Sequence, residues 1–110
     1  MDDELLENII VPKDKLTRYL LIHKDKNDKS KFLEQAGYTI ENWEILESDL
    51  RLLFRSGMII FEEANEYGRS YSVIGSLTGP NGQILKVKTI WMYEMRNGQT
   101  KFITLFPDKK

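Results

Sequence analysis

The sequence predicts an α+β fold, in which two to three N-terminal helices pack on a C-terminal antiparallel β-meander of three to four strands. Apolar residues in the first half recur at helical spacing, most clearly over residues 43–54. After Gly57 the pattern alternates with a period of two, and Asn-Gly pairs at residues 81–82 and 97–98 are typical of hairpin turns. A length of 110 residues suits a single domain spanning residues 1–110.

Two short helices are expected first. One begins near Pro12, because the residue before a proline avoids helical geometry and Leu16, Tyr19 and Leu20 then form an apolar stripe. The other spans about residues 28–35, before the Ala36-Gly37-Tyr38 segment, where Gly37 is the expected left-handed cap.

A third helix and the strands complete the expected layout. The helix spans about residues 40–54, after a Thr-x-x-Asn start signal at residue 39. Strands are expected over residues 69–77, 83–95 and 100–106, and residues 58–62 are a fourth candidate.

The strand around Trp91 has two mixed faces. Residues at odd positions lie on one face and residues at even positions on the other: Val87, Thr89, Trp91 and Tyr93 against Lys86, Lys88, Ile90 and Met92. We expect Val87 and Trp91 to face the core, which makes Thr89 a buried hydroxyl with a hydrogen-bond partner. The opposite assignment would expose Thr89 and Trp91 as a recognition surface.

The last strand poses a related question at Thr104. Alternation places Phe102, Thr104 and Phe106 on one face. A threonine between two aromatic residues needs a polar partner if that face is buried.

Composition narrows the class of protein. There is no cysteine, which excludes disulfides and thiolate chemistry, and no apolar run approaches the roughly 20 residues that cross a bilayer. The acidic N-terminus lacks the basic flank of a secretory signal, so a cytoplasmic location is expected, although the chain could also be the C-terminal piece of a larger secreted protein. Phosphate loops, nucleophile elbows and zinc signatures are absent from the sequence, and neither a cofactor nor a metal site is expected.

The net charge of −1 hides a segregated pattern. Residues 1–8 carry −4 and residues 34–63 carry −5, whereas residues 13–31 and 86–110 each carry +4. If the two basic blocks meet in space they form one positive patch; the alternative is a set of solvated helix and loop faces.

Candidate functional residues begin around a predicted basic loop. His23 is the only histidine and a candidate general base, the alternative being an exposed loop residue. Lys24, Lys26, Lys29 and Lys31 follow and could hold phosphates, the alternative being a solvated loop and helix start.

A second candidate group starts a strand. Arg69 and Tyr71, with Tyr67 nearby, could stack a base and clamp a phosphate. The alternative is a cross-strand aromatic pair beside a solvated arginine.

Several short motifs occur in a familiar order. They are Lys-Leu-Thr-Arg-Tyr-Leu-Leu at 15–21, Lys-Ser-Lys-Phe-Leu at 29–33 with Ala-Gly-Tyr at 36–38, Gly-Pro-Asn-Gly at 79–82, Thr-Ile-Trp at 89–91 and Thr-Leu-Phe-Pro at 104–107. In this order the chain resembles a small bacterial domain family of uncharacterised function, found as short free-standing proteins and at the C-termini of toxin-like or phage-associated proteins. The layout is more distantly similar to the RelE, barnase and EndoU-like ribonuclease toxins. Members of the first family favour Gly or Pro before the lysine matched by Lys29, where this chain has Asn27-Asp28.

The resemblance implies a metal-independent endoribonuclease of bacterial toxin type. Such enzymes use the 2′-hydroxyl of RNA as nucleophile and need a base, an acid and cations. The expected catalytic roles are Lys29 and Arg69 on the phosphate, His23 or Tyr71 in proton transfer, and Thr89 or Thr104 as orienting donors. The expected RNA-contacting residues are Lys24, Lys31, Lys86, Lys88 and Trp91.

The alternative function is a non-catalytic binding module, such as an antitoxin, an immunity protein or a mobile-element accessory protein. Its working surface would be the acidic stretch from Glu34 to Glu63, and its partner a basic toxin. An exposed last strand would also permit a homodimer.

Overall fold

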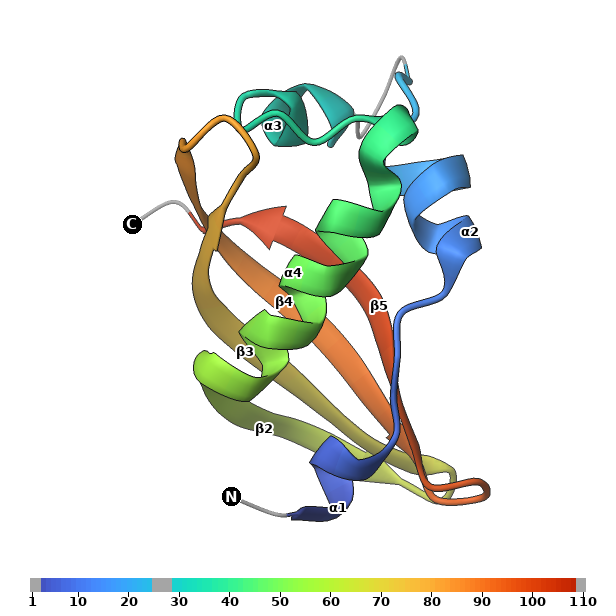
Figure 1. Cartoon of the computed structure of the whole chain (residues 1–110). Coiled ribbons are helices and arrows are strands. Elements are labelled where there is room, and N and C mark those ends of the chain that lie inside the picture. The colour runs from blue at the N-terminus through green and yellow to red at the C-terminus, as the bar shows by residue number, and fades with distance from the viewer. Residues whose placement is uncertain (1–2, 25–28, 109–110) are drawn as a thin grey trace.

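The computed structural model describes residues 3–24 and 29–108, and it has the predicted α+β architecture (Figure 1). The helical elements are α1 (Asp3–Glu7), α2 (Lys13–Lys15), the π-helical turn η1 (Leu16–Leu20), α3 (Ser30–Glu34), the 3-10 turn η2 (Ile40–Asn42) and α4 (Trp43–Ser56). The strands are β1 (Ile9–Ile10), β2 (Met58–Asn65), β3 (Gly68–Thr78), β4 (Ile84–Glu94) and β5 (Gln99–Pro107). The predicted start of the second helix at Asp28 and Lys26 of the predicted lysine cluster lie outside the described residues.

The strands form one sheet in the order β1-β5-β4-β3-β2. Strands β2 to β5 are the predicted antiparallel meander. Glycines at positive φ occur where the sequence predicted them, at the Gly37 cap and at the Asn-Gly turns of Gly82 and Gly98. The parallel pairing of β1 with Thr100 and Lys101 of β5 was not predicted, and it makes the sheet mixed.

The first predicted helix is irregular. The N–H of Leu21 donates to the carbonyl of Leu16, five residues back, which widens the turn. Leu16 and Leu20 are buried as predicted, but Tyr19 is 56% exposed, so its assignment to the apolar stripe was wrong.

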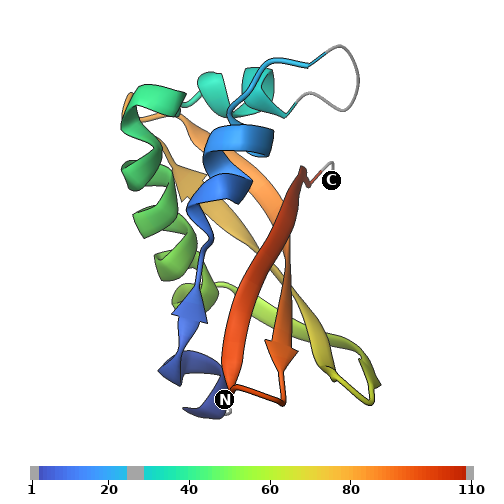
Figure 2. The same cartoon turned by 90° about the vertical axis from the view of Figure 1, so that its right-hand side faces the viewer.

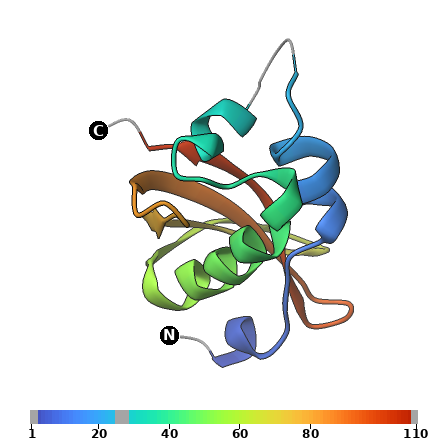
Figure 3. The same cartoon turned by 45° about the horizontal axis from the view of Figure 1, so that its top comes forward.

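Helix α4 lies across one face of the sheet (Figure 3). Its apolar stripe buries Leu46, Leu50, Leu53 and Phe54. The Phe54 ring lies 4.7 Å from the Trp91 ring, whose other neighbour is Phe102 at 5.3 Å. Burial of each such side chain stabilises the fold by roughly 1.5–3 kcal/mol. In the described part of the chain, no helix covers the opposite face (Figure 2).

The helix-covered face of β4 is the one that contains Trp91. Val87 and Trp91 are fully buried, which confirms that they face the core. The alternative, in which Thr89 and Trp91 form an exposed recognition surface, is wrong. The Thr89 hydroxyl donates to the Val73 carbonyl over 2.9 Å and accepts from the Trp91 indole N–H over 2.7 Å. Thr89 is therefore a satisfied core hydroxyl.

A β-bulge in β5 changes the expected alternation. Ile90 pairs with Thr104 but the next residue, Trp91, pairs with Phe102, so Ile103 is an extra residue. The inserted residue inverts the faces: Phe102 is buried under α4, whereas Thr104 lies on the open face. The prediction that Phe102 and Thr104 share a face was wrong for this reason.

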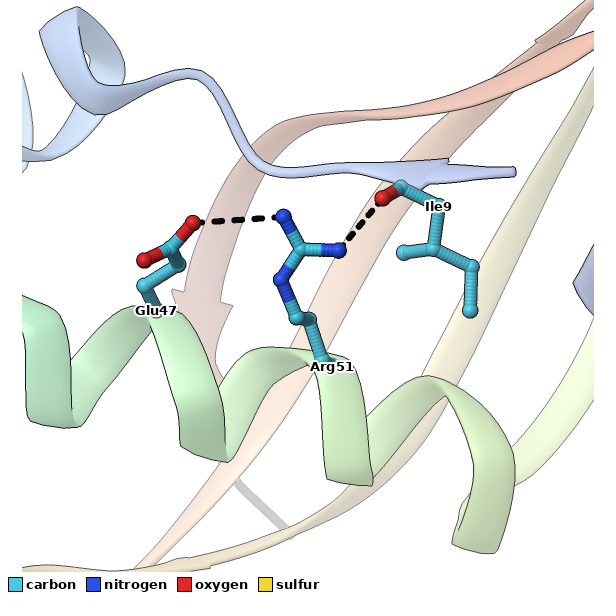
Figure 4. A network of polar contacts seen from close by, with 3 residues as sticks. All are labelled: Ile9, Glu47 and Arg51. Carbon is cyan, nitrogen blue, oxygen red and sulfur yellow. Dashed lines mark hydrogen bonds and ion pairs between the residues drawn. The ribbon is translucent and has the colours of Figure 1, made fainter.

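The N-terminal arm is tied to α4 and β5. The Arg51 guanidinium donates to the Ile9 carbonyl and pairs with Glu47 over 3.2 Å (Figure 4). The Thr100 hydroxyl donates to the Leu5 carbonyl over 2.9 Å. Strand β1 ends at Ile10, and among the described residues no strand pairs with the outer edge of β5 beyond Lys101.

Among the described residues, none of the helices has both the length and the hydropathy that spanning a bilayer requires.

Candidate functional site

The free edge of β5 brings together residues that are far apart in the sequence. The Lys29 ammonium, at the start of α3, donates to the Thr104 hydroxyl over 2.8 Å and lies 4.3 Å from the centre of the Phe106 ring. Seventy-five positions separate Lys29 from Thr104. The contact joins the two basic blocks of the sequence, one of the two alternatives that the charge pattern left open, at the edge that faces the viewer in Figure 2.

A second lysine, Lys24, lies close enough to act electrostatically on Lys29. Lys24 follows η1, and its ammonium lies 4.7 Å from the centre of the Tyr19 ring. The pKa of Lys29 is lowered, chiefly by burial and further by the positive charge of Lys24. An anion bound close to both ammonium groups would be attracted by both positive charges.

A hollow of about 380 Å³, here called the Thr104 hollow, lies beside these lysines. It is lined by Lys15, Tyr19, Leu20, Ile103 and Thr104. Its floor therefore combines η1 with the bulge of β5. This volume falls in the range of sites that bind small molecules or single groups of a polymer.

The open face of the sheet adds further lysines. Lys88 on β4 is the register partner of Phe106, and Lys86 lies two residues away on the same face and is exposed. Both lysines were predicted to contact RNA, and their positions extend the positive patch from Lys29 across β4.

Two other predicted residues are close in sequence to the lysines of this edge. His23 is exposed in the turn that follows η1, directly before Lys24. Lys31 is exposed on α3, two residues after Lys29. Each position is compatible with contact to a ligand at the edge.

The remaining predicted residues lie on the helix-covered face. Arg69 is the register partner of Tyr93, and its guanidinium stacks on that ring at 4.8 Å. Tyr71 is 8% exposed and contacts Phe61 edge-on at 5.7 Å, the cross-strand aromatic pair that the sequence left open. Arg69 and Lys29 lie on opposite faces of the sheet, so the two cations expected to share one phosphate do not converge.

Burial also removes two candidates. Trp91 is fully buried and has no exposed ring face on which a base could stack. Thr89 uses its hydroxyl inside the core. Two of the six expected catalytic residues, Lys29 and Thr104, contact each other directly. Thr89 and Tyr71 lie on the helix-covered face and do not reach the open face.

Sequence reasoning missed the aromatic part of the site. Tyr19 was assigned to the core, and Phe106 was noted for its place in the alternation and in the Thr-Leu-Phe-Pro motif, not as a binding residue. Knowledge of the π-turn and the bulge is needed to place either ring at the surface. The one available signal was Thr104, whose need for a partner is met by Lys29.

A larger hollow, of about 630 Å³, lies at the other end of the sheet. Its lining residues come from the β2–β3 turn, the β4–β5 turn and the end of β4: Glu66, Tyr67, Met92, Glu94, Met95 and Arg96. Glu94 is engaged by Lys101 at 3.1 Å, and this contact lowers its pKa. We place the candidate site at Thr104 despite its smaller volume, because paired cations and a hydroxyl converge there.

Acidic side chains do not offer an alternative metal centre in the part of the chain that the structure describes. No group of three or more His, Cys, Asp or Glu residues there is arranged to hold a metal ion.

Comparison with known proteins adds a family and a fold. The model of DUF6883, a domain of unknown function, matches residues 2–109. No curated protein matches the chain. A chain in the contact-dependent growth inhibition toxin–immunity protein complex from Klebsiella pneumoniae 342 is similar in structure, with a TM-score of 0.67 and 18% identity over 90% of this chain and 99% of that one. At this identity the similarity shows a shared fold.

Proposed function

Because the chain belongs to the DUF6883 family, a domain of unknown function, its role has to be inferred from its site, and we propose that it is a metal-independent endoribonuclease of bacterial toxin type. The observation that carries the proposal is the contact of the Lys29 ammonium with Thr104 at the rim of the Thr104 hollow, with Lys24 close by. Cations with a partly desolvated ammonium at their centre suit the phosphodiester of RNA.

The reaction needs few groups from the protein. The 2′-oxygen of RNA attacks the adjacent phosphorus, the bond to the 5′-oxygen breaks, and the products are a 2′,3′-cyclic phosphate and a free 5′-hydroxyl. A base removes the proton of the 2′-hydroxyl, and the departing 5′-oxygen takes up a proton. We assign proton transfer to His23, which lies next to Lys24 in the chain.

Lys29 and Thr104 act on the phosphate. The ammonium stabilises the negative charge that develops on the non-bridging oxygens. Thr104 accepts a hydrogen bond from Lys29, which leaves the proton of its own hydroxyl available to a phosphate oxygen. Lys24 adds a second positive charge. Arg69, Tyr71 and Thr89 have no part in this revised site.

The fold adds support of a different kind. The similar Klebsiella chain belongs to a toxin–immunity protein complex, and a relation of fold to that system fits a role on either side of it. A role in RNA cleavage rests on the site.

The rival role is an immunity or antitoxin module that uses the acidic stretch from Glu34 to Glu63. Several acids of that stretch are engaged within the protein: Glu47 pairs with Arg51, Glu62 accepts from the Ser72 hydroxyl, and Asp49 accepts from the Tyr38 hydroxyl. The ion pair with Arg51 compensates the charge of Glu47, whereas a neutral hydroxyl compensates no charge, so the stretch remains a candidate binding surface. We favour the nuclease because Lys29 and Thr104 converge at the edge of β5.

The test uses transfer RNA in excess EDTA. The native protein is expected to release fragments with 2′,3′-cyclic phosphate ends. Lys29→Ala is expected to lose about 10²–10³-fold in rate, as when one donor to a developing negative charge is removed. Arg96→Ala, a loss of the same charge at the far hairpin turn, is the matched control and keeps the native rate.

Two results would contradict the proposal. One is native protein that leaves RNA intact at micromolar concentration, and the other is Lys29→Ala that cleaves as fast as native protein. In the first case, stable association with a basic toxin would favour the immunity role.

A further inference from the structure

Two exposed aromatic rings flank the Lys29 site. Tyr19 is 56% exposed and Phe106 is 45% exposed, whereas the core aromatic residues Trp91, Phe54 and Phe102 are fully buried. Each exposed ring has a lysine ammonium within 5 Å of its centre: Lys24 at 4.7 Å and Lys29 at 4.3 Å. Both pairs adjoin Thr104, because Tyr19 lines the same hollow as Thr104 and Lys29 contacts Thr104 directly.

This arrangement is complementary to a nucleotide, which joins a flat base to a phosphate. Each ring has a lysine ammonium over one face, so a flat base would stack on the opposite face while the ammonium accepts a phosphate. Lys29 contacts both Thr104 and Phe106, so a base on Phe106 brings its adjoining phosphate toward the Lys29–Thr104 pair. On the open face, Lys88 opposite Phe106 offers a cation for the next phosphate along the strand.

Stacking on a protein ring requires a base that is not already paired. In a duplex the bases are stacked on each other inside the helix, and side chains reach mainly phosphates and groove edges. A site built on phosphate charge alone would accept duplex and single strand alike.

We propose that the site takes single-stranded RNA, with one base stacked on Tyr19, another on Phe106 and a phosphate on Lys29. This inference rests on the proposed nuclease function and adds its substrate class. Tyr19 and Phe106 are then specificity-determining residues that bind unpaired bases, while Lys29 and Thr104 act on the phosphate.

The test measures binding by fluorescence anisotropy in EDTA. The probes are an unstructured RNA 12-mer, its 2′-deoxy counterpart and a 12-base-pair RNA duplex. Native protein is expected to bind both single strands at least tenfold more tightly than the duplex. Tyr19→Leu and Phe106→Leu each lose about tenfold in affinity for the single strands and little for the duplex.

Salt dependence separates stacking from charge. The ring variants are expected to keep the slope of log affinity against log salt, whereas Lys29→Ala lowers the slope by about one phosphate contact. Tyr67→Leu removes a ring that is 73% exposed in the β2–β3 turn, and it is expected to bind as native protein does.

The outcomes distinguish the two proposals. Equal binding of duplex and single strand, or unchanged binding by both ring variants, would overturn the inference while leaving cleavage at Lys29 in place. Ring-dependent binding of both single strands without RNA cleavage would support the stacking surface and overturn the nuclease. No binding to any probe would overturn both.

Discussion

Thr89 and Thr104 lie in neighbouring register positions on adjacent strands, yet they belong to opposite faces of the sheet. Ile90 pairs with Thr104, and the residue beside it, Thr89, pairs with Leu105. Both threonines were predicted as orienting donors. The Thr89 hydroxyl donates to the Val73 carbonyl and accepts from the Trp91 indole. The Thr104 hydroxyl, at an open edge, accepts from the Lys29 ammonium. The comparison teaches that the face, and not the residue type, decides whether such a hydroxyl serves the core or a ligand.

The physical difference is access to water and anions. On the covered face an unpaired polar group is costly, so each one is matched inside the protein. On the open face Lys29 is only partly desolvated, and its charge can still be met by an incoming phosphate. The two faces can therefore be perturbed separately.

The largest expected loss of stability follows from a substitution at the centre of the covered face. Trp91→Ala removes the ring between Phe54 and Phe102 and should lower the free energy of unfolding by about 3–5 kcal/mol. Urea denaturation followed by circular dichroism measures the change. Phe106→Ala, on the open face and 45% exposed, is the matched control and should cost about 1 kcal/mol. Equal losses for the two variants would contradict the division into faces.

A smaller perturbation tests the buried hydroxyl. Thr89→Val keeps the shape of the side chain but leaves the Trp91 indole N–H without its acceptor, which should destabilise the fold by about 1–3 kcal/mol. The same change at the partly exposed Thr104 should alter stability by less than about 0.5 kcal/mol. If Thr89→Val is as stable as native protein, the role given to this hydroxyl is wrong.

Most of the fold could be predicted because local patterns specify it. The helical spacing of Leu46 and Leu50 predicts α4, and the two Asn-Gly turns predict the hairpins. The parallel strand β1 could not be predicted from two residues whose partners, Thr100 and Lys101, lie 91 positions along the chain.

The site could be predicted only in part. Lys29 and Thr104 were both named, but their contact depends on the bulge at Ile103, which carries no local sequence signal here. Without the bulge, Thr104 would face the helices beside Phe102. Phe106 changes face by the same inversion, which is why its exposed ring was missed.

On the open face, Thr104→Val should reduce activity more than stability. Loss of the hydroxyl removes the partner that orients the Lys29 ammonium, and a reduction of about tenfold in cleavage rate corresponds to one hydrogen bond. Thr104→Ser restores the hydroxyl and should recover most of the rate. A Ser variant as slow as the Val variant would point instead to a packing role for the methyl group.

The smallest expected effect concerns pH. The lowered pKa of Lys29 has burial as its main cause and the charge of Lys24 as its second. Lys29 must carry a proton to stabilise the phosphate, so cleavage should fall as the pH rises through its pKa. Lys24→Gln removes the second cause alone, and the alkaline limb of the rate profile should move to higher pH while remaining below that of a fully exposed lysine.

The same ionisation affects stability, with a definite sign. Between the lowered pKa of folded Lys29 and the higher value of the unfolded chain, the unfolded state binds more protons, so stability rises with pH across this window. Lys24→Gln should shrink that rise, whereas Arg96→Gln, at the far hairpin turn, should leave both the rise and the alkaline limb unchanged. An alkaline limb that stays in place in Lys24→Gln, or that moves equally in both variants, would mean that Lys24 does not act on Lys29. Burial would then be the cause that lowers the pKa of Lys29.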